Sequence, residues 1–141
     1  MTAPTPLRHT FPKAEHLCLQ RDIEALFSAG SRSLSVFPVR AVFRSVAAGE
    51  GPRVKVLVSV SKRKLKHAVD RNRAKRQLRE AYRLRKHTLA VALPEGTGLH
   101  VGLLWMAATP QPSAAVARAV GRLLHALTER AVPAATPLER P

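Results

Sequence analysis

Residues 53–61, RVKVLVSVS, carry the feature that most constrains the fold of this chain. Every second residue is a valine, and the residues between the valines form a mixed set: Lys55, Leu57, Ser59 and Ser61. Successive side chains of a β-strand point to opposite faces of the sheet. The period of two therefore predicts a strand whose valine face belongs to a core.

Apolar spacing predicts the other elements. A helix is predicted over residues 19–29, with Gly30 ending it. Residues 35–45 alternate and predict a strand, with Phe37 and Val39 on one face and Arg40 and Arg44 on the other. The nearly uncharged run 99–108 predicts an inner strand. A last helix begins with Ser113 as its cap and carries an apolar stripe: Val116, Val120, Leu123, Leu124 and Leu127. The order α-β-β-α-β-α predicts one sheet with helices packed on it, an α/β sandwich.

A basic helix is predicted directly after the valine strand, over residues 71–86. One arc is apolar: Ala74, Leu78, Ala81 and Tyr82. A neighbouring arc is polar and basic: Asn72, Lys75, Arg76, Arg79, Arg83 and Lys86. Asp70 is expected to cap the helix, and Arg85, which interrupts the apolar arc, is expected to fray it or to extend its charge to solvent. Glu80 can pair with Arg76 or Arg83, but such exposed pairs contribute only about 0.3–0.5 kcal/mol.

The positive charge is concentrated in this part of the chain. Residues 62–87 hold 12 of the 24 lysines and arginines, against 9 acids in all, and the formal net charge is +15. Charge of this density opposes a compact fold, so it indicates a polyanionic partner. No apolar run approaches the roughly 20 residues that span a membrane. A strand rather than a helix precedes the basic helix, which disfavours a DNA-reading helix-turn-helix. RNA is the partner that this pattern favours.

Three segments resemble the bacterial ribonuclease P protein component. RNRAKRQLREAYR (71–83) is similar to that family's Arg-Asn-Arg signature, VSVSKRKLKHAV (58–69) to its strand and crossover, and FPKAEHLCLQRDIEALFSAG (11–30) to its N-terminal opening. The resemblance covers about residues 11–130. It implies an α+β two-layer fold with one mixed sheet of about four strands, three helices and a left-handed β-α-β crossover.

The resemblance also implies a function. In that family a catalytic RNA subunit, with Mg²⁺ held mainly by RNA, removes the 5′ leader of precursor tRNA, and one protein binds this RNA and the leader. The resemblance implies RNA contacts by the signature residues Arg71, Asn72, Arg73, Lys75, Arg76 and Arg79. The charge of the helix arc and of the segment before it adds four expected RNA-binding residues: Lys62, Arg63, Lys66 and Arg83. The resemblance places Ile23 and Phe27 in the leader cleft. The alternation of the strands adds the polar residues of the face opposite the valines as its expected floor: Arg40, Lys55, Ser59 and Ser61. Phe27 equally fits an ordinary place in the core.

Two other functions are compatible with a small basic protein. A structural RNA-binding protein of the ribosomal type shares the charge and the fold class. A self-sufficient nuclease needs clustered carboxylates or histidines to hold Mg²⁺, and the acids and histidines of this chain show no such spacing. Cys18, the only cysteine, excludes an internal disulfide. We expect a flexible segment over residues 1–10, one RNA-binding domain over 11–132, a disordered tail over 133–141, and a cytoplasmic location.

Overall fold

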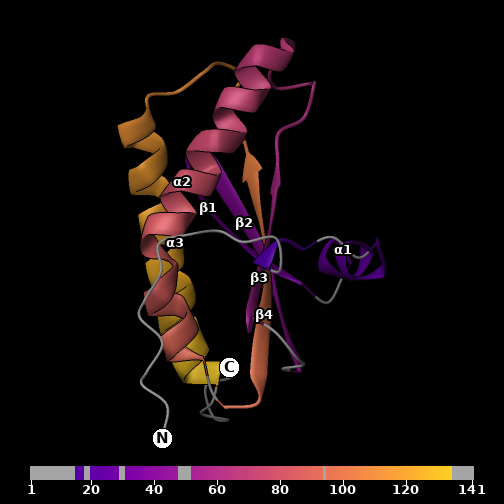
Figure 1. Ribbon diagram of the computed structural model, residues 1–141, viewed down its shortest axis with the longest axis vertical. Helices are drawn as coiled ribbons and strands as arrows, with labels where there is room; N and C mark the ends of the chain where they lie inside the picture. Colours follow the sequence, from indigo (N-terminus) through magenta and orange to yellow (C-terminus); the bar gives the residue numbers. More distant parts are fainter. Residues whose placement is uncertain (1–14, 18–19, 29–30, 48–51, 94, 135–141) are drawn as a thin grey trace, which may run out of the picture.

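The computed structural model describes residues 15–17, 20–28, 31–47, 52–93 and 95–134. Helices α2 (Ala68–Ala92) and α3 (Ser113–Ala134) lie side by side on one face of a four-stranded sheet, and the short helix α1 (Gln20–Leu26) lies on the other face (Figure 1). Three helices on one sheet confirm the predicted fold class. The expected segments 1–10 and 133–141 lie outside the described residues, except that residues 133 and 134 continue α3.

The predicted single strand over residues 35–45 is wrong, because two strands lie there. β1 (Arg32–Val36) and β2 (Val39–Ala47) pair as an antiparallel hairpin around Phe37 and Pro38. Phe37 therefore lies in the turn, 64% exposed, and not on the core face with Val39. Proline has no N–H to donate to a strand partner, so Pro38 marks a turn that the alternation of side chains conceals.

The sheet has the strand order β1-β2-β4-β3. β3 (Val54–Ser59) runs parallel to β4 (Thr97–Trp105), and the other neighbours are antiparallel, so the sheet is mixed. β4 lies between β2 and β3, which confirms the inner strand predicted over 99–108. α2 carries the chain from β3 to its parallel neighbour β4, and the left hand of this crossover stays a prediction.

The main core lies between the sheet and the pair α2 and α3. The apolar arc predicted for the basic helix is buried throughout, with Leu78 fully enclosed and Tyr82 1% exposed. The predicted stripe of α3 is buried as well, and it meets the valine face of β3 and the apolar residues of β2 and β4 in one cluster. Burial of these surfaces is the main force that holds the helices on the sheet.

A second, smaller apolar cluster holds α1 on the opposite, open face of the sheet. Its members come from α1, the segment before it and three strands: Leu17, Ile23, Leu26, Val42, Leu57 and Leu104. Gly102 of β4 lies directly under α1, since a Cβ added there would stand 3.2 Å from the Leu26 side chain and 3.7 Å from that of Phe27. The missing side chain lets the helix approach the strand closely.

The helix ends differ from the predictions. α2 begins at Ala68, its N-cap position is His67 and no side chain caps it, so the capping role predicted for Asp70 is wrong. Asp70 lies in the first turn, where its charge still favours the helix dipole. The helix also continues past Arg85 to Ala92 without fraying. None of the described helices is both long enough and apolar enough to cross a membrane.

α1 and α3 show smaller differences. α1 ends at Leu26, and the predicted stop at Gly30 lies outside the described residues. Ser113 is the first residue of α3 and not its cap, because the N–H of Val116 donates to the carbonyl of Pro112. The Ser113 hydroxyl instead accepts a hydrogen bond from the Gln77 amide of α2 at 2.9 Å. This contact ties the N-terminus of α3 to α2.

Candidate nucleic-acid interface

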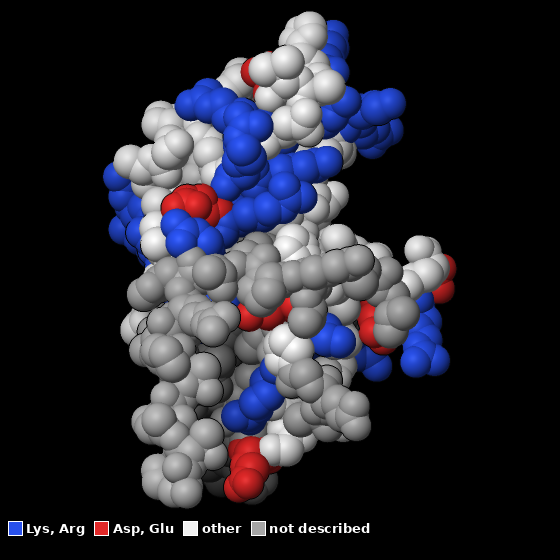
Figure 2. Space-filling view, viewed as in Figure 1, with Lys and Arg blue, Asp and Glu red and all other residues white. Residues whose placement is uncertain are grey.

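Lysine and arginine side chains gather on the N-terminal half of α2 and on the loop that leads into it (Figure 2). Five predicted RNA-binding side chains on this half have no hydrogen bond or ion pair with any described residue: Asn72, Arg73, Lys75, Arg76 and Arg79. We call these five residues the helix surface. Like charges at helical spacing repel by a few tenths of a kcal/mol per pair. No described carboxylate forms an ion pair with these cations, so their charge is available to an outside partner.

The loop between β3 and α2, residues 61–67, continues this charge, and we call it the crossover loop. Its exposed cations comprise the three predicted residues and one more: Lys62, Arg63, Lys64 and Lys66. Leu65 is the exception, because it is 3% exposed and belongs to the main core. The guanidinium of Arg71 on α2 donates to the carbonyls of Leu65 and Lys66 at 2.9 and 2.7 Å. Arg71 therefore differs from the cations of the helix surface, because it has hydrogen-bond acceptors within the chain.

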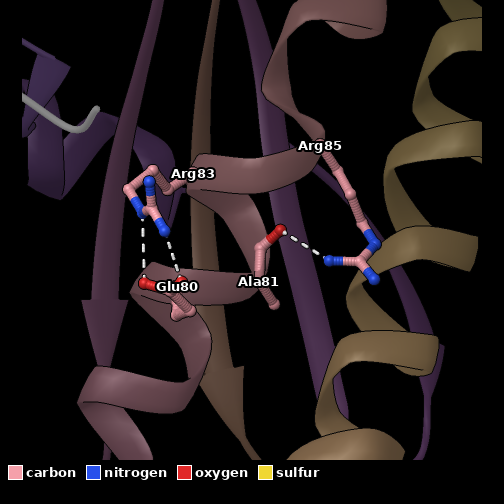
Figure 3. Close-up of polar contacts among 4 residues, drawn as sticks. All are labelled: Glu80, Ala81, Arg83 and Arg85. Atoms are coloured by element: carbon pink, nitrogen blue, oxygen red, sulfur yellow. Dashed lines mark hydrogen bonds and ion pairs between the residues drawn. The ribbon is translucent and has the colours of Figure 1, made fainter. Parts of the chain in front are cut away.

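Arg83 pairs with Glu80, which is one of the two pairings expected from the sequence. Its Nε donates to a Glu80 carboxylate oxygen at 3.1 Å, and a terminal nitrogen donates to the other oxygen (Figure 3). The hydrogen bond lowers the pKa of Glu80 and raises the pKa of Arg83. The Glu80 carboxylate is exposed and the Arg83 side chain is 32% exposed, so water screens the pair and it contributes little to stability. Arg83 nevertheless brings less net charge to the surface than Arg76 or Arg79.

Lys86 does not belong to the exposed basic arc, which corrects the helical-wheel prediction. It is 7% exposed, and its ammonium donates to both carboxylate oxygens of Glu15 at 2.7 and 2.9 Å. Tyr82 lies about one helical turn before Lys86. Burial raises the pKa of Tyr82, and the negative charge of Glu15 is a second cause. The ion pair fastens the segment 15–17 to α2, and the same segment follows β3 through the N–H of Leu17, which donates to the carbonyl of Val56.

Arg85 is directed towards α3 instead of solvent. Its guanidinium donates to the carbonyl of Ala81 at 3.3 Å (Figure 3). Its side chain crosses α3 at Gly121, because a Cβ added to that glycine would stand 3.2 Å from the Arg85 Nε. Arg85 therefore packs in the groove between the two helices and is not a candidate for binding an outside phosphate.

The open face of the sheet carries polar residues in rows across the strands. Arg44 of β2, His100 of β4 and Lys55 of β3 are in register and form one row. Partial burial lowers the pKa of His100; Asp22 of α1 opposes this shift, and Lys55 and Arg44 add to it. Arg44 also donates to the carbonyl of Ala25 at 3.1 Å, so it binds the C-terminus of α1.

A hollow of about 160 Å³ opens on this face between the C-terminal end of α1 and the β1–β2 hairpin. Its polar and aromatic lining comes from both: Phe27, Ser28, Ser31, Arg32, Ser33 and Arg40. Phe27 is 49% exposed, and Arg40 donates to the Ser33 hydroxyl at 3.3 Å. An aromatic ring beside two arginines and several hydroxyls can receive a base and its phosphates.

Comparison with known proteins identifies the family of the chain. The sequence model of the family described as Ribonuclease P matches residues 11–126. The chain belongs to the ribonuclease P protein family. It is 40% identical over 91 residues to the ribonuclease P protein component of Porphyromonas gingivalis strain ATCC 33277, covering 64% of this chain and 66% of that protein. It is 38% identical over 100 residues to the component of Chlorobaculum tepidum, covering 68% and 65%. The chain thus spans slightly less than two thirds of the length of each of these two relatives.

Solved structures of ribonuclease P proteins have the same fold. The protein from Staphylococcus aureus superposes with a TM-score of 0.63 at 19% identity, covering 81% of this chain and 95% of that one. The protein from Thermotoga maritima gives a TM-score of 0.55 at 23% identity, covering 77% and 96%. At these identities the likeness is one of fold. It confirms three helices on one mixed four-stranded sheet.

The structure brings only part of the predicted leader cleft together. Phe27 and Arg40 line the hollow, whereas Lys55 and Ser59 lie on β3, two strands away from β2. Ile23 packs in the apolar cluster under α1, and Ser61 lies in the crossover loop beyond the end of β3. The family signature on α2 is likewise divided, since Arg71 has carbonyl acceptors within the chain and Arg73 has no described partner.

Sequence reasoning missed several residues of the open face. Arg32 and Ser33 line the hollow from β1, and His100 lies between Arg44 and Lys55. Recognition of Pro38 as a turn would have placed Arg32 and Ser33 beside β2. His100 carried no signal, because its neighbours come from strands that are adjacent only in the folded sheet. Among the described residues no group of three or more His, Cys, Asp or Glu side chains could hold a metal ion.

Proposed function

We propose that this chain is the protein subunit of ribonuclease P and assists the endonucleolytic removal of the 5′ leader from precursor tRNA. The observation that carries the proposal is the helix surface, whose cations have no described partner within the chain and match the family signature. Phosphates of a folded RNA supply the counter-charge that the protein lacks there. The hydrolysis is assigned to the RNA subunit, with Mg²⁺ held mainly by RNA.

The RNA subunit is the proposed partner of the helix surface and the crossover loop, one protein per RNA, in the cytoplasm. Their exposed cations form a continuous basic region on the upper part of the molecule in Figure 2. If about six phosphates are neutralised, log K should fall with log salt concentration at a slope of roughly −4 to −5. A steep salt dependence is therefore the signature of this surface.

The hollow on the open face is the proposed site of the single-stranded leader. Phe27 supplies a surface on which a base can stack, and Arg32 and Arg40 supply charge for phosphates. Arginine and serine contacts to a backbone discriminate little between bases, so a range of leader sequences should be accepted. Lys55 and Ser59 extend the polar face towards β3. Since α2 lies on the other face of the sheet, both RNA partners can be held at once.

Reconstitution with a ribonuclease P RNA tests the function. The protein should stimulate cleavage of precursor tRNA at low Mg²⁺ concentration. A variant with Arg76→Gln and Arg79→Gln should need more protein for the same stimulation. A control variant with Arg118→Gln and Arg122→Gln removes the same charge from exposed positions of α3 and should behave like the wild type. Absence of stimulation by the wild-type protein would favour a structural RNA-binding role. Equal behaviour of both variants would place the interface elsewhere.

The leader site has its own test. Phe27→Ala should weaken binding of precursor tRNA to the reconstituted enzyme by about tenfold, since stacking on an aromatic side chain contributes about 1–3 kcal/mol per base. Binding of mature tRNA, which has no leader, should not change. A loss that is equal for the two RNAs would mean that Phe27 supports the fold and does not contact the leader.

A further inference from the structure

The crossover loop has a defined backbone conformation although most of its side chains are charged and exposed. The N–H groups of Lys64 and Leu65 both donate to the carbonyl of Ser61 at 3.2 Å, and the Lys64 N–H also reaches the Ser61 hydroxyl at 3.3 Å. Leu65 is inserted into the main core. These contacts fold the loop into one closed turn, with its cations directed outwards.

Arg71 completes this turn from the helix side. Its Nη1 donates to the carbonyls of Leu65 and Lys66, the two residues that follow the turn. A charged donor makes hydrogen bonds roughly twice as strong as those of neutral groups, and one nitrogen shared by two carbonyls fixes their relative orientation. Arg73, two residues further on, is exposed and has no described partner. The two arginines of the Arg-Asn-Arg signature therefore occupy different environments.

We propose that Arg71 is a positioning residue that holds the crossover loop in its RNA-binding conformation, and that Arg73 contacts the RNA. This inference rests on the proposed function, because it assumes that the loop binds the RNA subunit. Four cations on a loop of seven residues repel one another, and in a free chain they would spread apart. Fixing the backbone before binding reduces the conformational entropy that is lost on binding, which raises affinity without a new contact.

A double-mutant cycle separates positioning from contact. In the first step Arg71→Gln is compared with Arg73→Gln in the wild-type background, with affinity for the ribonuclease P RNA as the measurement. In the second step both are repeated in a loop-neutral background: Lys62→Gln, Arg63→Gln, Lys64→Gln and Lys66→Gln. When one residue acts through another, the effects of substituting the two on the binding free energy are coupled. When the two residues make independent contacts, these effects add.

Arg71→Gln should weaken RNA binding about tenfold in the wild-type background and less than about twofold in the loop-neutral background, because the loop then has no cations to position. Arg73→Gln should have the same effect in both backgrounds and should flatten the salt slope by about 0.7–0.9. Equal losses for Arg71→Gln in the two backgrounds would overturn the inference. If the proposed function is wrong, the result is different: the loop-neutral protein would then bind the ribonuclease P RNA as tightly as the wild-type protein does.

Hydrogen exchange of the free protein gives a readout that does not involve RNA. The Lys64 and Leu65 amides donate within the turn, so Arg71→Gln should increase their exchange rates, and Arg73→Gln should leave them unchanged. Amides in the interior of β4 serve as the reference for global stability and should be protected equally in both variants. Unchanged exchange at Lys64 and Leu65 in the Arg71 variant would show that the loop holds its conformation without this side chain.

Discussion

Both halves of α2 carry arginine and lysine side chains, but the surroundings of these side chains differ between the two halves. In the N-terminal half, Arg73, Arg76 and Arg79 have no described partner, and their charge is exposed. In the C-terminal half, Arg85 crosses α3 at Gly121 and Lys86 is buried against Glu15. Lysine and arginine residues occur from Arg71 to Lys86, in both halves of the helix, yet only the first half has cations that are exposed and without a described partner. Charge counted along a sequence therefore overstates the size of a binding surface when part of it serves the fold.

The largest effect should come from the buried ion pair of the C-terminal half. Lys86→Ala leaves the Glu15 carboxylate without its partner, and breaking a buried pair in this way costs about 3–5 kcal/mol. Urea unfolding should show this loss, whereas Lys75→Ala, on the helix surface, should change the free energy of unfolding by less than about 0.5 kcal/mol. Similar stabilities for the two variants would remove the distinction between the halves.

The environment of Tyr82 should make stability depend on pH in the alkaline range. Its pKa is raised in the folded protein, so above about pH 10 the unfolded chain loses the phenol proton while the folded chain keeps it. The stabilising contribution is complete below pH 10 and is lost as the pH rises, with a slope of up to about 1.4 kcal/mol per pH unit.

Tyr82 is the only tyrosine of the chain, so tyrosinate absorbance reports on it alone. The folded protein should show no tyrosinate band until it unfolds. Tyr82→Phe should remove the added slope between pH 10 and 11. A tyrosine that titrates at its ordinary pH in the folded protein would mean that the C-terminal half of α2 is open to solvent.

Most of the difference between the two halves of α2 could not be predicted from the sequence, because it depends on contacts between residues that are distant in the chain. The alternation of Val54, Val56 and Val58 and the stripe of α3 report the core because burial follows the period of a strand or helix. The contact of Lys86 joins it to Glu15, 71 positions away, and no local spacing reports such a pair. Likewise Arg85 interrupts an apolar arc in sequence, and only Gly121 on another helix explains how it is accommodated.

The sequence predicted where the helix surface and the crossover loop lie, but not the contacts within them. The run of cations after the valine strand predicted both the helix surface and the crossover loop, since charge without nearby acids requires an outside partner. It did not distinguish Arg71 from Arg73, because their difference depends on where the loop carbonyls of Leu65 and Lys66 point. The hairpin that supplies Arg32 to the hollow was missed because alternation continues through the turn at Pro38.

A smaller effect, on binding rather than stability, is expected in the N-terminal half. Arg76→Ala should weaken binding to the RNA subunit about fivefold and flatten the salt slope by about 0.7–0.9, since one phosphate loses its cation. Arg85→Ala removes the same charge from the C-terminal half and should leave the slope unchanged. Filter binding over a series of salt concentrations measures both. Equal slopes for Arg76→Ala and the wild-type protein would remove Arg76 from the interface.

The smallest effect concerns the crossing of Arg85 and Gly121. Replacing a helical glycine by alanine gains about 0.5–1 kcal/mol, but here the new Cβ would stand 3.2 Å from the Arg85 Nε, so that side chain has to move by a few tenths of an ångström. Gly121→Ala should therefore stabilise the wild-type protein by less than it stabilises the Arg85→Ala variant. The difference between the two gains, measured by urea unfolding, reports how firmly α3 holds Arg85. Equal gains would mean that Arg85 moves away without cost and is as free as the cations of the helix surface, which would reduce the contrast within α2 to Lys86 alone.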